Sequence, residues 1–420
     1  MYRVATLKNG LTIATAEMPH MTSVSVGIWV GVGSRYEPPP INGMCHFIEH
    51  LLFKGTQKRS ARKISEAIEG IGGSLNAFTS EESTCFHARA GYERLPEVLD
   101  VLVDMLVDSR FAPAEIVKER NVIKEEIAMY WDEPQHLVHE LLNQTLWPNQ
   151  ALGRPITGTP ATLDRISRRQ ILDYLHRNYV SGNTVIVAAG RLKHRSVARL
   201  VSRYARRFSF GSPPTCAPVL TEQKEPRVRL FTKKTEQTQM ALGIRTFSRH
   251  DDRRYALRLL NVILGENMSS RLFQAVREDR GLAYSIYSSP SFFNDTGDLV
   301  ISAGLDLRNL EKTLRLIIRE LRRCVASPPS PLELRRARDY VLGQIDLGCE
   351  NTETQMNWVG EQLLGYGRIF SIDEIKRRLR ALVPGDLRAL ARDIFRSERL
   401  NLALVSPLRS DRRLNSLMRI

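Results

Sequence analysis

The sequence predicts two homologous α+β domains, each with a mixed β-sheet flanked by helices. The chain has 420 residues, too many for one ordinary hydrophobic core and enough for two domains of about 200 residues each. Pro213, Pro214 and Pro218 interrupt regular structure near the midpoint, and the same order of elements occurs on both sides of them. We therefore expect an N-terminal domain at 1–210, a linker at 211–222 and a C-terminal domain at 223–420.

The first half opens with alternating apolar and polar residues around Asn9 and Gly10, a pattern typical of a β-hairpin. Because these residues belong to the fold, no signal peptide is expected. The elements that follow are a strand at 22–32, a helical region at 43–70, strands at 74–80 and 83–90, and helices at 93–106 and 113–127.

The second half repeats this order. Its expected elements are a strand at 238–247, helices at 252–265 and 270–281, strands at 282–289 and 298–305, and helices at 309–323 and 331–345. The last helices of the two series align without a gap at an offset of 218 residues, which places Pro113 on Pro331. Each half is thus expected to hold a mixed sheet covered by helices on one side.

Composition argues against two classes of protein, nucleic-acid-binding proteins and membrane proteins. The net charge is +15, but the arginines are spread over several helices without interleaved aromatic residues, so no nucleic-acid partner is expected. No run of about 18 apolar residues is present, so no membrane association is expected. Five cysteines without paired spacing suit a reducing, cytoplasmic environment.

The segment GMCHFIEHLLFKGT, residues 43–56, carries the strongest chemical signal. At the helical advance per residue, Glu49 and His50 fall within about 60° of His46, and the apolar residues occupy the opposite side. Histidines at positions i and i+4 can bind one metal ion from one helix, with the carboxylate beside them. The alternative is a pair of hydrogen-bonded core histidines.

A third ligand is expected from the helix at 113–127. Glu119 and Glu126 lie seven residues apart and share one line along that helix, whereas Glu125 points about 100° away. We therefore favour Glu126 as the ligand and Glu119 as a supporting residue; the alternative is a solvated charged face. At the offset of 218, Ala337 and Gln344 occupy the matching positions, so the second half lacks this site.

These residues resemble a known family. H-x-x-E-H is the inverzincin motif, and the chain resembles the pitrilysin–insulinase zinc peptidases, in particular short bacterial members related to the β-subunit of mitochondrial processing peptidase. In that family the third ligand ends an E-R-N-x-x-x-x-E pattern, which matches residues 119–126. Residues 72–84, 153–159 and 269–286 also resemble family segments. The resemblance implies a duplicated, clamshell-like metallopeptidase fold.

The resemblance also implies a mechanism. One Zn²⁺ per chain would be held by His46, His50 and Glu126, with water in the fourth position. Glu49 would take the proton of this water and deliver it to the departing amine. Glu119, and with less support Glu82, would assist. The expected activity is that of a metalloendopeptidase acting on peptides or unfolded polypeptides.

Substrate-binding residues are expected in both halves. Residues 74–80 alternate like an edge strand, and the resemblance gives Asn76 and Ala77 the role of binding an extended peptide; the pattern alone also fits an ordinary paired strand. From the second half, the resemblance assigns Arg277 and Tyr284 to the substrate backbone and the oxyanion. Gly281 should end the preceding helix, so Tyr284 should begin a strand.

The resemblance also suggests partners. A homodimer is expected, and a heterodimer with an inactive homologue is the alternative. Some relatives are structural or interaction subunits that have lost ligands, but His46, Glu49, His50 and Glu126 are all present here, which favours the enzyme. One departure is the segment Gly265-Glu266-Asn267, where relatives often have a glycine cluster.

Overall fold

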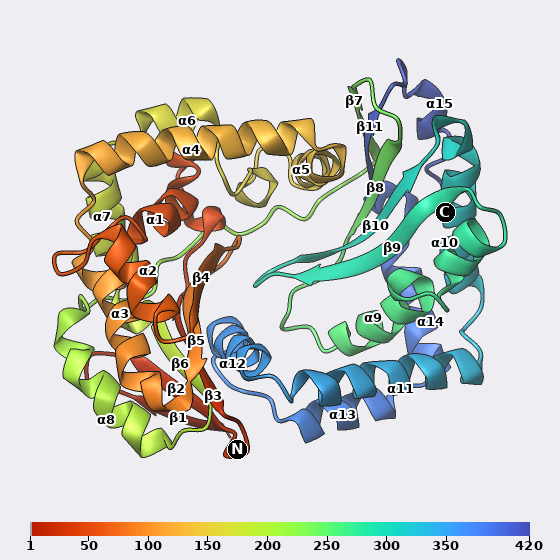
Figure 1. The fold of residues 1–420 in the computed structure, drawn as a ribbon. Helices are drawn as coiled ribbons and strands as arrows, with labels where there is room; N and C mark the ends of the chain where they lie inside the picture. Colours follow the sequence, from red (N-terminus) through yellow and green to blue (C-terminus); the bar gives the residue numbers. More distant parts are fainter. Residues whose placement is uncertain (1) are drawn as a thin grey trace. The chain divides into compact units, whose positions relative to one another are not determined.

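The computed structural model describes residues 2–420, which form two compact units (Figure 1). The first unit comprises the residues up to Ala128, Arg154–Ala217 and Asp346–Phe370; the second comprises Met129–Gly153, Pro218–Ile345 and Ser371–Ile420. The chain passes between units at Ala217, within the expected linker at 211–222. Two further segments each belong to the unit formed mainly by the other half of the chain: residues 129–153 lie in the second unit and residues 346–370 in the first.

The first unit holds a six-stranded sheet of order β1-β2-β6-β3-β5-β4. Its strands are β1 (Tyr2–Thr6), β2 (Thr12–Glu17), β3 (Ser23–Val30), β4 (Ser74–Thr79), β5 (Thr84–Gly91) and β6 (Thr184–Gly190). The β1–β2 pair is the expected hairpin around Asn9 and Gly10. The β2–β6 pair is parallel and all other pairs are antiparallel, so the sheet is mixed.

The second unit holds a five-stranded sheet of order β7-β11-β8-β10-β9. Its strands are β7 (Arg227–Thr232), β8 (Thr238–Arg245), β9 (Ala283–Phe292), β10 (Gly297–Leu305) and β11 (Leu400–Ser406). If β1 is left out, the first sheet reads β2-β6-β3-β5-β4 and matches the second sheet strand for strand. In each of these series the parallel pair, β2–β6 or β7–β11, joins the strand that comes first in the chain to the strand that comes last. The predicted internal repeat is therefore confirmed as a duplicated sheet topology.

Helices cover both faces of the first sheet. The helices that lie wholly or mostly in this unit are α1 (Met44–Leu52), α2 (Ala61–Glu69), α3 (Leu95–Asp108), α4 (Pro113–Asp132), α6 (Pro160–Arg165), α7 (Arg168–Asn178), α8 (His194–Tyr204) and α12 (Thr352–Tyr366). The larger core lies on the face that carries α1 and α3, and includes Val26 and Ile28 of β3. The opposite face of β3 packs against α12, where Trp29 donates a hydrogen bond to the sulfur of Met356.

The second unit contains α5 (Pro134–Leu146), α9 (Arg254–Asn261), α10 (Leu310–Ala326), α11 (Pro331–Gly348), α13 (Ile372–Ala381), α14 (Pro384–Ile394) and α15 (Arg412–Asn415). Helix α5 packs on β8 and β11, as α12 packs on β3 and β6. Helices α5 and α12 begin 218 residues apart, so they are equivalent in the repeat. Each half of the chain therefore supplies one helix to the unit formed mainly by the other half (Figure 1).

This exchange corrects the expectation that helices cover only one side of each sheet. Strands β3 and β6 are buried along nearly their whole length, because helices pack on both faces. Sheets covered on both faces favour continuous apolar strands over alternating ones. The expected helix at 252–265 also differs: α9 ends at Asn261 and continues as a π-helical turn, Val262–Glu266. Within residues 2–420, no helix is both long and apolar enough to span a membrane.

Candidate metal centre

Helix α1 presents the H-x-x-E-H residues on the side opposite the core. Its apolar side chains, Met44, Cys45, Phe47, Ile48, Leu51 and Leu52, are all buried. His46, Glu49 and His50 occupy the remaining side and are partly accessible. Gly43 precedes the helix with a φ of +96°, a conformation in which an L side chain is strained, and a Cβ there would lie 2.7 Å from the Thr157 carbonyl oxygen.

The start of α1 is capped by a buried carboxylate, Glu37. Its side chain accepts hydrogen bonds from the backbone N–H groups of Gly43 and Cys45, each at 2.7 Å, and from the Asn42 amide at 2.9 Å. The two backbone donors are among the N–H groups that a helix start leaves unpaired. Burial raises the pKa of Glu37 to about 7, although these donors act in the opposite direction.

Helix α4 brings the third candidate ligand to α1. Glu126 Oε1 lies 3.8 Å from His46 Nε2, and Glu126 Oε2 lies 3.5 Å from His50 Nε2. One ligand atom from each of the three residues lies within 4.8 Å of the other two. Ligands of a tetrahedral zinc ion are separated by about 3.3–3.6 Å when each bond is about 2.0–2.2 Å. The donor types and their spacing therefore fit one zinc ion after small side-chain movements.

The second nitrogen of His50 faces another carboxylate of α4. Glu119 Oε2 lies 3.3 Å from His50 Nδ1, and Glu119 Oε1 lies 2.8 Å from the ammonium of Lys54. The Glu119 side chain is only 1% exposed. Contacts of this kind orient a metal-binding histidine and leave its other nitrogen for the metal.

The two histidines have different electrostatic surroundings. Burial, followed by the charge of His50, lowers the pKa of His46 to about 4, so its imidazole is neutral at neutral pH, as a metal ligand must be. Burial also acts to lower the pKa of His50, but the contacts with Glu126 and Glu119 outweigh it, and the pKa is raised.

Glu49, the candidate general base, is held by a residue of the edge strand. The Thr79 hydroxyl donates a hydrogen bond of 2.5 Å to Glu49 Oε2. Burial raises the pKa of Glu49, and the hydrogen bond from Thr79 opposes that rise. Glu82 Oε1 instead pairs with Arg35 at 2.7 Å; an assisting role for Glu82 stays a prediction.

The expected edge strand is confirmed. β4 is the last strand of the first sheet and, among residues 2–420, pairs only with β5, in which His87 and Phe86 face Asn76 and Ala77. Helix α1 packs beside β4. One backbone edge of β4 is therefore open to pairing with a further strand. The binding of substrate by Asn76 and Ala77 stays a prediction.

Arg277 and Tyr284 lie together in the second unit. The Arg277 guanidinium is 5.6 Å from the centre of the Tyr284 ring, and Tyr284 as a whole residue is 74% exposed. Gly281 follows the π-helical turn Phe273–Glu278 with a φ of +59°, and β9 begins at Ala283, so the predicted change from helix to strand is confirmed. The contact of Arg277 and Tyr284 with substrate stays a prediction.

Comparison with known proteins identifies the family. The family described as Insulinase (Peptidase family M16) matches residues 12–160, and the one described as Peptidase M16 inactive domain matches residues 165–341. A protein of Streptomyces coelicolor named an uncharacterized zinc protease is 40% identical over 97% of this chain and 90% of its own length. The chain belongs to the insulinase (M16) peptidase family.

Further relatives of this M16 chain agree. The zinc protease YmxG of Bacillus subtilis is 38% identical over 97% of this chain and 98% of its own. A crystal structure of a Helicobacter pylori protease has a TM-score of 0.91, at 20% identity, covering 97% of this chain and 99% of the other. At that identity the structural match supports the fold, and the sequence relatives support the zinc peptidase family.

The inactive-domain match agrees with the asymmetry of the repeat. Helix α11 is equivalent to α4, and carries Ala337 and Gln344 where α4 carries Glu119 and Glu126. Ala337 is buried at 2% exposure, so this position belongs to the packed side of α11.

In the Gly265-Glu266-Asn267 segment, Glu266 forms an ion pair with Arg258 and accepts a hydrogen bond of 2.8 Å from Asn261.

Three residues that contact this M16 site were not predicted from the sequence. They are Glu37, Lys54 and Thr79. Lys54 lies four residues after His50, so helical spacing could have placed its side chain on the same face as His50. Glu37 and Thr79 contact α1 from separate segments of the chain, and no local sequence pattern predicts those contacts.

Proposed function

We propose that this chain is a cytoplasmic, zinc-dependent metalloendopeptidase that hydrolyses peptides or unfolded protein segments. The observation that carries the proposal is the arrangement on α1. His46 and His50 face Glu126 of α4, and Glu49 projects from the same side of α1, held by Thr79. Two imidazole ligands, one carboxylate ligand and an adjacent second carboxylate are the groups that metal-assisted hydrolysis needs.

A bound zinc ion would lower the pKa of its water to about 7 and polarise the scissile carbonyl. The residues of the chain supply the proton transfer, the orientation of the ligands and the binding of the peptide. Glu49 accepts a proton from the attacking water and returns it to the departing amine nitrogen. Glu119 orients His50 through Nδ1. The peptide would pair with β4 through backbone hydrogen bonds, which demand little of its sequence.

The proposal includes a partner. A homodimer is proposed on the family resemblance, with a heterodimer that contains an inactive homologue as the alternative. The mass in solution, measured by light scattering with zinc present, distinguishes them: a dimer of the purified chain supports the first, and a monomer contradicts it.

The test of activity compares the zinc-loaded wild type with Glu49→Gln on a mixture of unstructured, internally quenched peptides. We expect the wild type to cleave and the variant to lose at least about 100-fold in kcat, because the proton acceptor is gone. Zinc content is measured on both proteins. Glu125→Gln is the matched control, since Glu125 is exposed one residue from Glu126. Wild type that binds zinc but cleaves nothing would favour a structural or interaction subunit.

A further inference from the structure

Lys54 lies just beyond the metal-binding helix, in the turn that follows α1. Its backbone N–H donates a hydrogen bond to the Leu51 carbonyl at 3.0 Å, which continues the helical path past Leu52. Its ammonium lies 2.8 Å from Glu119 Oε1, while the other oxygen of the same carboxylate lies 3.3 Å from His50 Nδ1. Glu119 therefore connects a positive charge on one side to a candidate ligand on the other.

The burial of Glu119 makes that positive charge important. The Glu119 side chain is 1% exposed, and an isolated buried carboxylate is costly unless a counter-charge or donors compensate it. Lys54 is 29% exposed and supplies the counter-charge. A carboxylate oxygen accepts a hydrogen bond, so Nδ1 is the nitrogen of His50 that donates to Glu119, and Nε2, on the side of Glu126, is left to bind a metal ion.

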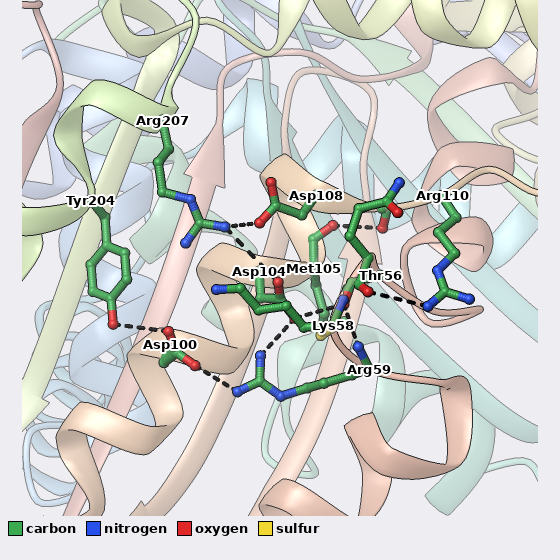
Figure 2. Close-up of polar contacts among 12 residues, drawn as sticks. Thr56, Lys58, Arg59, Asp100, Asp104, Met105, Asp108, Arg110, Tyr204 and Arg207 are labelled. Atoms are coloured by element: carbon green, nitrogen blue, oxygen red, sulfur yellow. Dashed lines mark hydrogen bonds and ion pairs between the residues drawn. The ribbon is translucent and has the colours of Figure 1, made fainter.

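The turn that carries Lys54 is fixed to helix α3. Figure 2 shows Thr56 and Arg59 meeting the acidic residues of that helix. Thr56 is fully buried and donates to Asp104 at 2.7 Å, while its own Oγ1 accepts from the Arg59 N–H at 2.9 Å. The Arg59 guanidinium contacts Asp104 at 2.6 Å and Asp100 at 2.5 Å. Two residues after Lys54, the chain is thus tied to α3 through the side chain of Thr56.

The candidate ligands differ in this support. His46 Nδ1 is buried and, among residues 2–420, has no hydrogen-bond partner. His50 Nδ1 faces Glu119. Of the two imidazole rings, the one whose Nδ1 is oriented by a protein side chain is that of His50, and the residue that orients it is Glu119.

We propose that Lys54 is a positioning residue of the metal centre: its ammonium, held by the turn fixed to α3, pairs with one oxygen of Glu119 and so keeps the other oxygen aimed at His50. The inference rests on the proposed zinc site, and adds Lys54 and its anchoring turn to the groups on which zinc affinity depends. It does not depend on peptide hydrolysis, because the expected effect is on the binding of the ion.

The experiment measures zinc affinity by competition with a chromophoric chelator at one pH. We expect Lys54→Met to weaken binding by about tenfold or more, as for other residues that support a metal ligand, and Lys54→Arg to retain most of the affinity. Lys124→Met is the matched control. Lys124 is also 29% exposed and pairs with Asp164 at 2.6 Å, so we expect its loss to leave zinc affinity within twofold of wild type.

A double-mutant cycle separates positioning from a general loss of structure. Glu119→Gln alone should weaken zinc binding, and adding Lys54→Met to it should cause no further loss, because the charge acts through Glu119. Unchanged affinity in Lys54→Met, or an equal loss with and without Glu119, would overturn the proposal. Zinc binding without hydrolysis by the wild type would contradict only the proposed function, whereas absence of zinc binding would overturn both.

Discussion

Thr79, at the end of the edge strand β4, donates a hydrogen bond of 2.5 Å to Glu49, the candidate general base on α1. The contact joins two elements of the proposed site: β4, the last strand of the first sheet, and the helix that carries the H-x-x-E-H residues. A hydrogen bond to a charged group is worth about 1.5–3 kcal/mol, so it can decide the orientation of Glu49.

The first prediction concerns this hydrogen bond. Thr79→Val keeps the shape of the side chain and removes the hydroxyl, so Glu49 loses its donor. We expect kcat to fall about tenfold while zinc content is unchanged. Thr79→Ser restores the hydroxyl and should recover most of the rate. Equal rates for Thr79→Val and the wild type would show that Thr79 does not orient Glu49.

The second prediction separates two adjacent carboxylates on α4. Glu126 faces both histidines, whereas Glu125 is exposed to solvent. Glu126→Gln should weaken zinc binding by at least about 100-fold, since it removes a charged ligand. Glu125→Gln should leave both metal content and activity unchanged. Metal analysis after dialysis checks both variants, and zinc retained by Glu126→Gln at wild-type affinity would exclude Glu126 as a ligand.

The third prediction is a pH dependence of stability caused by Glu37. The pKa of Glu37 in the folded protein, about 7, lies above its ordinary value of 4.5. The folded state therefore binds the proton more tightly, and this contribution is fully present below about pH 4.5. It is lost as pH rises to about 7, by up to about 3 kcal/mol in the free energy of unfolding.

Urea unfolding of the zinc-free protein between pH 5 and pH 8 tests this dependence. Glu37→Gln is expected to be less stable than wild type, because its NH₂ group would meet backbone donors. Its free energy of unfolding should also change less with pH than that of wild type. Glu125→Gln serves as control and should keep the wild-type slope. Parallel curves for wild type and Glu37→Gln would contradict the assignment.

The fourth prediction concerns the exchanged helix α12. A Cβ at Gly360 would lie less than 3.0 Å from atoms of the Trp29 ring. Gly360→Ala should therefore destabilise the protein by about 2–3 kcal/mol, although alanine normally favours a helix. Gly343 of α11 has open space around it, so Gly343→Ala should be neutral or stabilise by up to about 1 kcal/mol. Thermal unfolding measures both, and a Gly360→Ala variant as stable as wild type would contradict this packing.

The grouping of the candidate metal ligands was largely predictable from the sequence because its parts obey local periodicity. The spacing of His46, Glu49 and His50 places them on one side of α1, and the seven-residue spacing of Glu119 and Glu126 places both on one line of α4. Helical geometry alone fixes such relationships. The repeat was equally visible, because equivalent elements occur in the same order at a constant offset.

The contacts that hold those groups were decided only by the tertiary structure. Glu37, Lys54 and Thr79 approach α1 and Glu119 from a loop, a turn and a strand end, and nothing in the local pattern specifies their partners.

The sequence by itself determined which residues share a helix face, which segments repeat and which residue types fit a zinc ion. The tertiary structure decided where α12 packs, because an apolar helix face requires burial but does not specify which sheet covers it. It also decided which buried polar groups meet, since such pairs depend on the approach of segments distant in the chain.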